Sequence, residues 1–385
     1  MSLGSRREYL DVVRERYRGA RTRAEKGRII DEVVGTLGCH RKHAIRVLAG
    51  RRAAARPAKS RRRRKLYVEA LPAIALAWEA LDFCCAERLW PVLVETVHRL
   101  EQHGEIVVAP AVYEQLSRIS RSTLGRRLAE MPSPKSRRSI RRSKPTGGLR
   151  AEIPLGRYDW NENRPGALET DLVEHNGGSS LGHFAYTIDV VDVVSGWSRR
   201  QAVLGRGQAG IHAALSHIIQ QWPFQPWGLH SDNGPEFLSD QLVRFCKAND
   251  LEFTRSQTYH KNDNAHVEQK NLQFVREIVG YARYDTPEAV QWLNQVYDLL
   301  DLYANLFLPM RKVVAKQRLG SGVRKVYDTA QTPFQRLRKA AVLSPETEAA
   351  LQHQLDTNSP LALHRALESL LAAGPSAAAL PRTAD

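Results

Sequence analysis

Three acidic residues in the middle of the chain have types and positions suited to phosphodiester chemistry. Asp171 and Asp232 each stand within or directly after a short apolar run, and Glu268 follows Asp232 with thirty-five residues between them. The run before Asp232 and the sequence Asn233-Gly234-Pro235 after it predict a buried strand, a sharp turn and a helix from about Ser239. A carboxylate at the tip of a strand is a common place for a metal ligand or an acid–base group.

The residues around these acids resemble a known signature. They are Thr170-Asp171, then Ser231-Asp232-Asn233-Gly234-Pro235-Glu236-Phe237, then Asn264-Ala265, Glu268 and Asn271. In this order and spacing they are similar to the Asp-Asp-Glu signature of retroviral-type integrases and bacterial insertion-sequence transposases, more closely to the transposases. The match covers roughly residues 168 to 284 and implies a ribonuclease H-like core.

Three carboxylates suit phosphodiester cleavage, because cleavage needs an activated oxygen nucleophile, a stabilised leaving oxygen and neutralised phosphoryl charge. Two Mg²⁺ ions about 3.5–4 Å apart supply all three, and hard cations prefer oxygen ligands. The resemblance implies that Asp171 bridges both ions while Asp232 and Glu268 hold one each, with Mn²⁺ as a substitute. It also implies that no covalent protein–DNA intermediate forms.

The composition points to a polyanionic partner. The chain has 385 residues, a formal charge of +16 and a sequence pI near 9.9, and Lys and Arg side chains that meet phosphates release counterions. Nucleic acid is the obvious candidate. No run of about 18 apolar residues or signal-peptide start is present, so we expect a bacterial cytoplasmic protein associated with the nucleoid. The four cysteines form no Cys-x-x-Cys pair and predict reduced thiols.

Residues 1–50 predict a helix-turn-helix DNA-binding domain. Two helices with apolar faces, one of them containing Val12 and Val13, precede a turn over residues 35–38 and a third helix from His40 to Leu48. That helix is expected to bury Ala44, Ile45 and Leu48. Its candidate DNA contacts are Arg41, Lys42, His43 and Arg46. A plain three-helix bundle with a solvated basic face is the alternative.

A second helical DNA-binding domain is expected over residues 66–131, between basic linkers at 51–65 and 132–150. Its last helix, with Ser120 as N-cap, turns Leu124 and Leu128 inward. Candidate DNA contacts in this region are Arg61, Arg62, Arg63 and Arg64 in the first linker and Arg121, Ser122, Arg126 and Arg127 in the helix.

Residues 151–308 form the predicted catalytic core, in the order β-β-β-α-β-α-β-α. The strand of Asp171 is followed by strands at 183–192 and 198–204, a helix, the strand before Asp232, a helix at 240–248, a strand at 252–254 and the helix of Glu268. The fold class is therefore α/β of the ribonuclease H-like type, with all-α helix-turn-helix domains before it and a basic C-terminal segment at 309–385 after it. Four other acids, Asp189, Asp192, Glu236 and Asp263, are left out of the metal set, and Asp192 is expected to form a turn.

Several polar residues flank the acids and are candidates for contact with DNA: Lys261, Asn264, Asn271 and Arg276. Insertion-sequence relatives often carry Lys or Arg seven positions after the glutamate, but this chain has Val275 there and Arg276 one place later. His175 is equally well a polar group supporting the acids or a strand-end residue. The segment at 309–385 suits DNA or subunit contacts, or presents a solvated basic face.

The combination favours a DNA transposase that binds the terminal inverted repeats of its own element. It would cleave the 3′ strand at each end and join the freed 3′-hydroxyl to target DNA, as a homo-oligomer with at least two copies on double-stranded DNA. The alternatives are a sequence-specific regulator with an inactive ribonuclease H-like domain and a structure-specific nuclease of the same fold.

Overall fold

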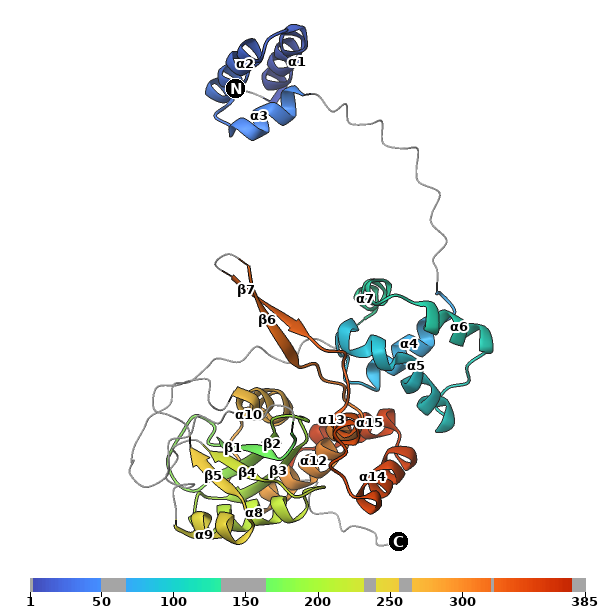
Figure 1. Cartoon of the computed structure of the whole chain (residues 1–385), viewed down its shortest axis with the longest axis vertical. Coiled ribbons are helices and arrows are strands. Elements are labelled where there is room, and N and C mark those ends of the chain that lie inside the picture. The colour runs from blue at the N-terminus through green and yellow to red at the C-terminus, as the bar shows by residue number, and fades with distance from the viewer. Residues whose placement is uncertain are drawn as a thin grey trace. The chain divides into compact units, whose positions relative to one another are not determined.

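The computed structural model describes residues 3–49, 67–132, 164–231, 240–255, 265–319 and 322–375, and every structural statement below concerns these ranges. The chain divides into two compact units, Met1–Leu66 and Tyr67–Asp385, which are treated separately (Figure 1).

The first unit is a bundle of three helices. These are α1 (Leu3–Gly19), α2 (Arg23–Leu37) and α3 (Arg41–Leu48). Thr22 and Glu25 form a capping box that starts α2, and Gly38, at φ +60°, ends it in the left-handed conformation. The expected turn over residues 35–38 is therefore too long, because α2 continues to Leu37.

The core of this bundle corrects two sequence expectations. Val13 is 1% exposed, whereas its neighbour Val12 is 62% exposed. Ala44 and Leu48 are fully buried, but Ile45 is 39% exposed. Consecutive helical residues point about 100° apart, so at these two places only one of the adjacent apolar residues reaches the core.

The second unit is built on a mixed five-stranded sheet in the order β3-β2-β1-β4-β5. Its strands are β1 (Ala167–Glu174), β2 (Ala185–Asp192), β3 (Ser198–Leu204), β4 (Gly228–Ser231) and β5 (Glu252–Arg255). The first three form an antiparallel meander, and β4 and β5 add to it in parallel with β1. The sequence-predicted order of strands and helices is confirmed, and it is the order that the integrase-like resemblance implies.

Helices pack on the sheet and position its acidic residues. They are α8 (Gln208–Gln220), α9 (Asp240–Ala248), a segment that runs as α10 (Ala265–Lys270), the π-helix η1 (Asn271–Arg276) and α11 (Glu277–Val279), and α12 (Pro287–Leu306). The α8 and α12 helices pack on β3, whereas α10 packs on β1 and β2 (Figure 1). The α8 helix buries one apolar face, formed by Ile211, Ala214, Leu215, Ile218 and Ile219.

The remaining helices come from two parts of the chain, one before the sheet in sequence and one after it. The helices are α4 (Leu71–Glu79), α5 (Ala86–Gln102), α6 (Pro110–Arg118), α7 (Arg121–Glu130), α13 (Pro333–Ala340), α14 (Pro345–Thr357) and α15 (Pro360–Ala373). The α15 helix packs on both α4 and α12. Residues 67–132 therefore pack within the same compact unit as the sheet, and their binding to DNA stays a prediction.

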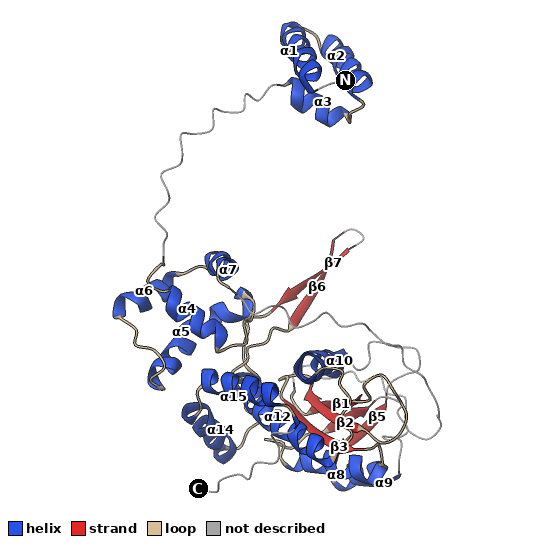
Figure 2. Cartoon of the chain, turned by 180° about the vertical axis from the view of Figure 1, so that it is seen from behind, coloured by secondary structure: helices blue, strands red, loops and turns tan. Residues whose placement is uncertain are grey.

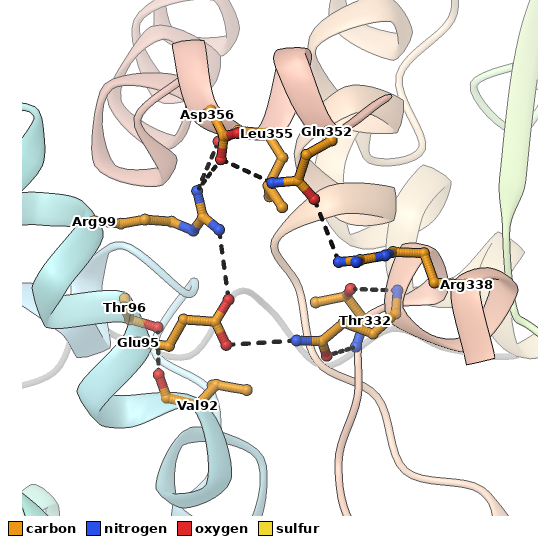
Figure 3. A network of polar contacts seen from close by, with 10 residues as sticks. Val92, Glu95, Thr96, Arg99, Thr332, Arg338, Gln352, Leu355 and Asp356 are labelled. Carbon is orange, nitrogen blue, oxygen red and sulfur yellow. Dashed lines mark hydrogen bonds and ion pairs between the residues drawn. The ribbon is translucent and has the colours of Figure 1, made fainter. Parts of the chain in front are cut away.

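A polar network joins α5 to the C-terminal helices (Figure 3). The Arg99 guanidinium donates to the backbone carbonyl of Leu355 at 2.9 Å and lies 3.4 Å from a carboxylate oxygen of Asp356. Gln352 donates to the same carboxylate at 2.9 Å. The chain segments on either side of the five-stranded sheet thus hold each other in place.

A two-stranded antiparallel ribbon follows α12 in the sequence and precedes α13. It consists of β6 (Val313–Leu319) and β7 (Gly322–Tyr327), and both views show it extending away from the five-stranded sheet (Figures 1 and 2). The basic segment predicted from residue 309 onward therefore contains a ribbon and three helices. In the described part of the chain, no helix is both long enough and apolar enough to cross a membrane.

Candidate active site

The β1 strand directs two acidic side chains toward the segment that begins with α10. Glu169 is 2% exposed, and its Oε2 accepts a hydrogen bond from the backbone N–H of Val267 at 2.9 Å. The first N–H groups of a helix lack partners within the helix and carry partial positive charge, so a carboxylate there stabilises the helix start. Sequence reasoning missed Glu169, although its place two residues before Asp171 puts both side chains on one face of the strand.

Asp171 contacts the same helical segment one turn further along. Its Oδ2 accepts a hydrogen bond from Nδ2 of Asn271 at 2.7 Å, and its Oδ1 accepts one from the N–H of Leu172 at 2.9 Å. The side chain is half-buried. Asp171 is therefore fixed in orientation by a residue from the third motif of the sequence signature.

Glu268 lies in α10, is exposed, and precedes Asn271 by three residues. Residues three apart on a helix are neighbours on its surface, about 60° apart around the axis. Because Asn271 points at Asp171, Glu268 projects from the side of the segment that faces the exposed end of β1. The structure thus brings the first and third acidic motifs to one place.

The second acidic motif lies outside the described residues, as do Glu236 and Asp263. The β4 strand ends at Ser231, which pairs in parallel with Thr170. The chain therefore leaves β4 beside the residue that precedes Asp171, and the next residue in sequence is Asp232.

The oxygen atoms at this place suit a divalent metal. The carboxylates of Asp171 and Glu268 are hard oxygen donors of the kind that Mg²⁺ prefers. Asn271 is 8% exposed, and its Oδ1 is a buried acceptor without a hydrogen-bond partner, which leaves a third oxygen next to Asp171. Among the described residues no three His, Cys, Asp or Glu side chains come together to hold a metal, and Asp232 is not one of those residues.

The π-helical segment between Glu268 and Arg276 changes the position of the arginine. A π-helix closes its hydrogen bonds between residues five apart, one more than an α-helix, so it adds a residue to the turn. The eighth residue after Glu268 then takes the direction that the seventh would have in an uninterrupted α-helix. Arg276, not Val275, therefore corresponds to the basic position of the resemblance, and Val275 is fully buried.

The surroundings of Arg276 agree with this placement. Its guanidinium lies over the ring of Tyr281, 4.5 Å from the centroid. Burial lowers the pKa of Arg276, while the negative charges of Glu174 and Asp171 act in the opposite direction. A half-buried guanidinium thus lies within electrostatic reach of the Asp171 carboxylate.

Beneath the site lies a layer of buried charge. Asp189 pairs directly with Asp171 across β1 and β2, is fully buried, and has a carboxylate oxygen 3.3 Å from Nε of Arg200. Arg200 also forms an ion pair with Asp301 of α12. Burial lowers the pKa of Arg200, but these two carboxylates outweigh it and hold the guanidinium charged. The positive partner of Asp189 is thus a buried arginine.

Lys270, the last residue of α10, belongs to the same buried layer. Its ammonium lies 4.6 Å from the centroid of the Phe274 ring, and Arg200 lies on that ring as well, at 4.9 Å. Burial, together with the charge of Arg200, lowers the pKa of Lys270 to about 7. Lys270 therefore points into the protein while Glu268, two residues earlier, is exposed.

Two other polar residues have structural roles. Asp192 accepts hydrogen bonds from the backbone N–H groups of Gly166 and Ser195, so its prediction as a turn-forming residue is confirmed. His175 is buried, its Nε2 is 2.7 Å from Oγ1 of Thr187, and burial lowers its pKa to about 3. His175 is therefore a neutral residue of the protein interior.

The candidate DNA contacts outside the core occupy exposed helix faces where they are described. Arg41, Lys42, His43 and Arg46 are exposed on α3, with Arg41 paired to Asp31. On α7, Arg121, Ser122 and Arg126 are exposed, Arg127 pairs with Glu130 at 3.0 Å, and Ser120 caps the helix over the buried Leu124 and Leu128 as predicted. Arg61, Arg62, Arg63, Arg64, Lys261 and Asn264 lie outside the described residues.

The chain thus combines a mixed α/β sheet of the predicted order with acidic side chains gathered from its first strand and its third motif. No family model matches the sequence. A curated relative, the uncharacterized protein y4rM of Sinorhizobium fredii, is 37% identical over 338 residues, which are 87% of this chain and 96% of that protein. The chain belongs to the same family as y4rM.

Solved structures with a similar arrangement include retroviral integrases. The HTLV-2 integrase catalytic core, in complex with magnesium, is 16% identical with a TM-score of 0.29, and covers 38% of this chain and 91% of its own. The BIV integrase catalytic core is 14% identical with a TM-score of 0.30, and covers 46% and 95%. These TM-scores are low, so the description of the fold rests on the strand order of this chain.

Proposed function

We propose that this protein is a DNA transposase of the Asp-Asp-Glu type, which cuts the 3′ strand at the ends of a mobile element and joins it to target DNA. The observation that carries the proposal is the pair of hydrogen bonds from β1 to the helical segment of Glu268, Glu169 to Val267 and Asp171 to Asn271. They join two sequence motifs that are nearly a hundred residues apart, as a shared active site requires.

The residues have distinct roles in this proposal. Asp171, Asp232 and Glu268 would hold Mg²⁺, which neutralises phosphate charge and lowers the pKa of an attacking water or 3′-hydroxyl. Asn271 orients the carboxylate of Asp171. Glu169 fixes the start of α10 and so the position of Glu268. Arg276 supplies a positive charge within electrostatic reach of Asp171, where it is suited to bind a phosphate oxygen of the DNA.

DNA and further copies of this chain are the proposed partners. A formal charge of +16 and the exposed basic faces of α3 and α7 suit binding to phosphates. Joining two element ends to one target needs more than one active site, so at least a dimer on DNA is proposed. The basic helices of the two units would each read part of an element end.

The proposal is tested with the DNA that surrounds the gene. Inverted repeats flanking the reading frame, bounded by short direct duplications, would supply the substrate. Purified full-length protein is incubated with labelled repeat ends and Mg²⁺, and cleavage and strand transfer are followed on denaturing gels. We expect Asp171→Asn, Asp232→Asn and Glu268→Gln each to bind the ends as the wild type does and to cut nothing.

Glu288→Gln is the matched control, because Glu288 is an exposed carboxylate in the first turn of α12, away from the three motifs. Cleavage at the wild-type rate by Asp171→Asn or Glu268→Gln would overturn the proposal. A wild-type protein that binds the repeats tightly and never cuts them would instead indicate a regulator. Cleavage that follows DNA junctions and ignores sequence would indicate a nuclease.

A further inference from the structure

The β6–β7 ribbon is fixed at its base to the catalytic unit. Met310 and Gln331 exchange backbone hydrogen bonds of 2.9 and 3.1 Å, and the N–H of Lys312 donates to Oδ1 of Asp328 at 2.7 Å. The Lys312 ammonium donates to the backbone carbonyl of Val193, directly after β2. The orientation of the ribbon is therefore tied to the sheet that carries Asp171.

The ribbon carries positive charge without acidic neighbours in sequence. Between residues 311 and 327 the chain has six basic residues and no Asp or Glu: Arg311, Lys312, Lys316, Arg318, Arg324 and Lys325. Arg318, Arg324 and Lys325 are exposed, and none of these three pairs with an acidic side chain in the part of the chain that the structure describes. The charge of the outer ribbon is thus available to an external anion.

The strand register distributes this charge over both faces. Lys316 pairs directly with Lys325, and Gln317 pairs with Arg324. Residues directly opposite each other share a face, and successive residues along a strand point to opposite faces. Lys325 and Arg318 therefore lie on one side of the ribbon and Arg324 on the other. Exposed cations therefore stand on both faces of the ribbon, which suits a polyanion as the partner.

The shape of the ribbon selects among polyanions. The major groove of B-form DNA, about 12 Å wide, admits a two-stranded β-ribbon, and its two walls are lined by phosphates. A ribbon with cations on both faces can meet both walls. Among the ribbon residues whose exposure the structure describes, the exposed apolar ones lie at its base, namely Val313, Val314 and Tyr327.

We propose that the β6–β7 ribbon is an arm that enters the major groove of duplex DNA and contacts its phosphates through Arg318, Arg324 and Lys325. It deepens the proposed function, since it adds a DNA contact to the unit that carries Asp171, apart from the proposed contacts of α3 and α7. Its binding role stands on the ribbon's charge and geometry. Only the statement that this DNA is also the substrate rests on the proposed function.

The test measures DNA binding without cleavage. Full-length wild type and Arg318→Ala/Arg324→Ala/Lys325→Ala are titrated against a fluorescent random-sequence duplex of about 30 base pairs, at salt from about 50 to 300 mM without divalent metal. Each phosphate contact contributes about 0.9 to the slope of log K against log salt, so the slope should fall by about 2 to 3. We expect binding about tenfold weaker or more near physiological salt.

The control is Arg338→Ala/Lys339→Ala/Arg365→Ala, which removes the same net charge from exposed positions on α13 and α15. It should leave the slope unchanged, and Arg318→Lys/Arg324→Lys should bind as the wild type does. Protection of guanine N7 from methylation should require the wild-type ribbon, because that atom faces the major groove.

Wild-type affinity and slope in the ribbon variant would overturn the inference, as would a variant that binds DNA normally but changes its oligomeric state in sedimentation. These outcomes are separate from those of the carboxylate variants. A ribbon that binds DNA in a protein that never cuts would leave the inference standing and refute the transposase proposal.

Discussion

Glu169 is the residue whose removal should most clearly separate catalysis from binding. Its side chain is 2% exposed and accepts a 2.9 Å hydrogen bond from the N–H of Val267 in the first turn of α10. Glu169→Ala leaves this buried N–H without its partner, which costs about 1–3 kcal/mol. The one lost methylene adds about 0.8 kcal/mol. The total, about 2–4 kcal/mol, falls on the start of the helix that carries Glu268.

Part of this cost can be relieved by movement of α10, and that movement is what would impair catalysis. Displacement of a catalytic group by about 1 Å is enough to slow a reaction about a hundredfold. We therefore expect Glu169→Ala to bind element ends as the wild type does but to cut them about 10² times more slowly. Glu169→Gln keeps an oxygen acceptor for Val267, so it should retain most of the cleavage rate.

The assay is single-turnover strand cleavage with saturating Mg²⁺, accompanied by DNA-binding titrations and thermal unfolding of each variant. Glu288→Ala, an exposed carboxylate at the start of α12, controls for loss of an acidic side chain. Cleavage at the wild-type rate by Glu169→Ala would refute the reasoning, because the hydrogen bond between Glu169 and Val267 would then have no part in positioning Glu268. Equal loss in Glu169→Gln and Glu169→Ala would show that charge, and not the acceptor, is what matters.

Three further predictions follow from the same region. Arg276→Ala should slow cleavage about 10- to 100-fold, the worth of a hydrogen bond to a charged group, and Arg276→Lys should recover part of the rate; an unchanged rate in Arg276→Ala would contradict the role given to it. Arg200→Leu leaves Asp189 and Asp301 buried without the guanidinium that pairs with them and should lower the free energy of unfolding by about 3–5 kcal/mol. Urea unfolding measures this change, and an unaltered urea midpoint would contradict the prediction. Burial lowers the pKa of Lys312 to about 8, below its unfolded value, so the folded state binds this proton more weakly and stability should rise from about pH 8 to 10.5. The rise should be smaller in Lys312→Met, where Lys270 with its lowered pKa still contributes, and parallel stability curves for the two proteins would contradict the prediction.

The sequence predicted the elements of the sheet well because their signals are local. The short apolar runs of the strands, with amphipathic helices after the third, fourth and fifth of them, produced the order found in the structure. The limits of α9 were also predicted correctly, since an apolar stripe with polar flanks marks them. In the structure β4 pairs in parallel with β1, which places Ser231 of the second motif opposite Thr170 of the first.

The features that sequence reasoning missed depend on contacts between distant residues. Glu169 looks like an ordinary strand residue until the start of α10 is placed against it. The exposure of Ile45 depends on how closely three helices approach one another. The ribbon had a local signal, since Gly320-Ser321-Gly322 separates two runs rich in valine and basic residues, but the basic charge led only to an expected basic segment for DNA or subunit contacts.

The widened turn after Glu268 affects how homologous chains should be aligned. A pattern that counts seven places from the glutamate reaches Val275, a fully buried aliphatic side chain, and would score this protein as lacking the cation. A gap of one position restores the correspondence with Arg276. Among homologues, a chain that lacks one residue of this stretch should form an uninterrupted α-helix with its cation seven places after the glutamate, because the guanidinium then keeps the same direction.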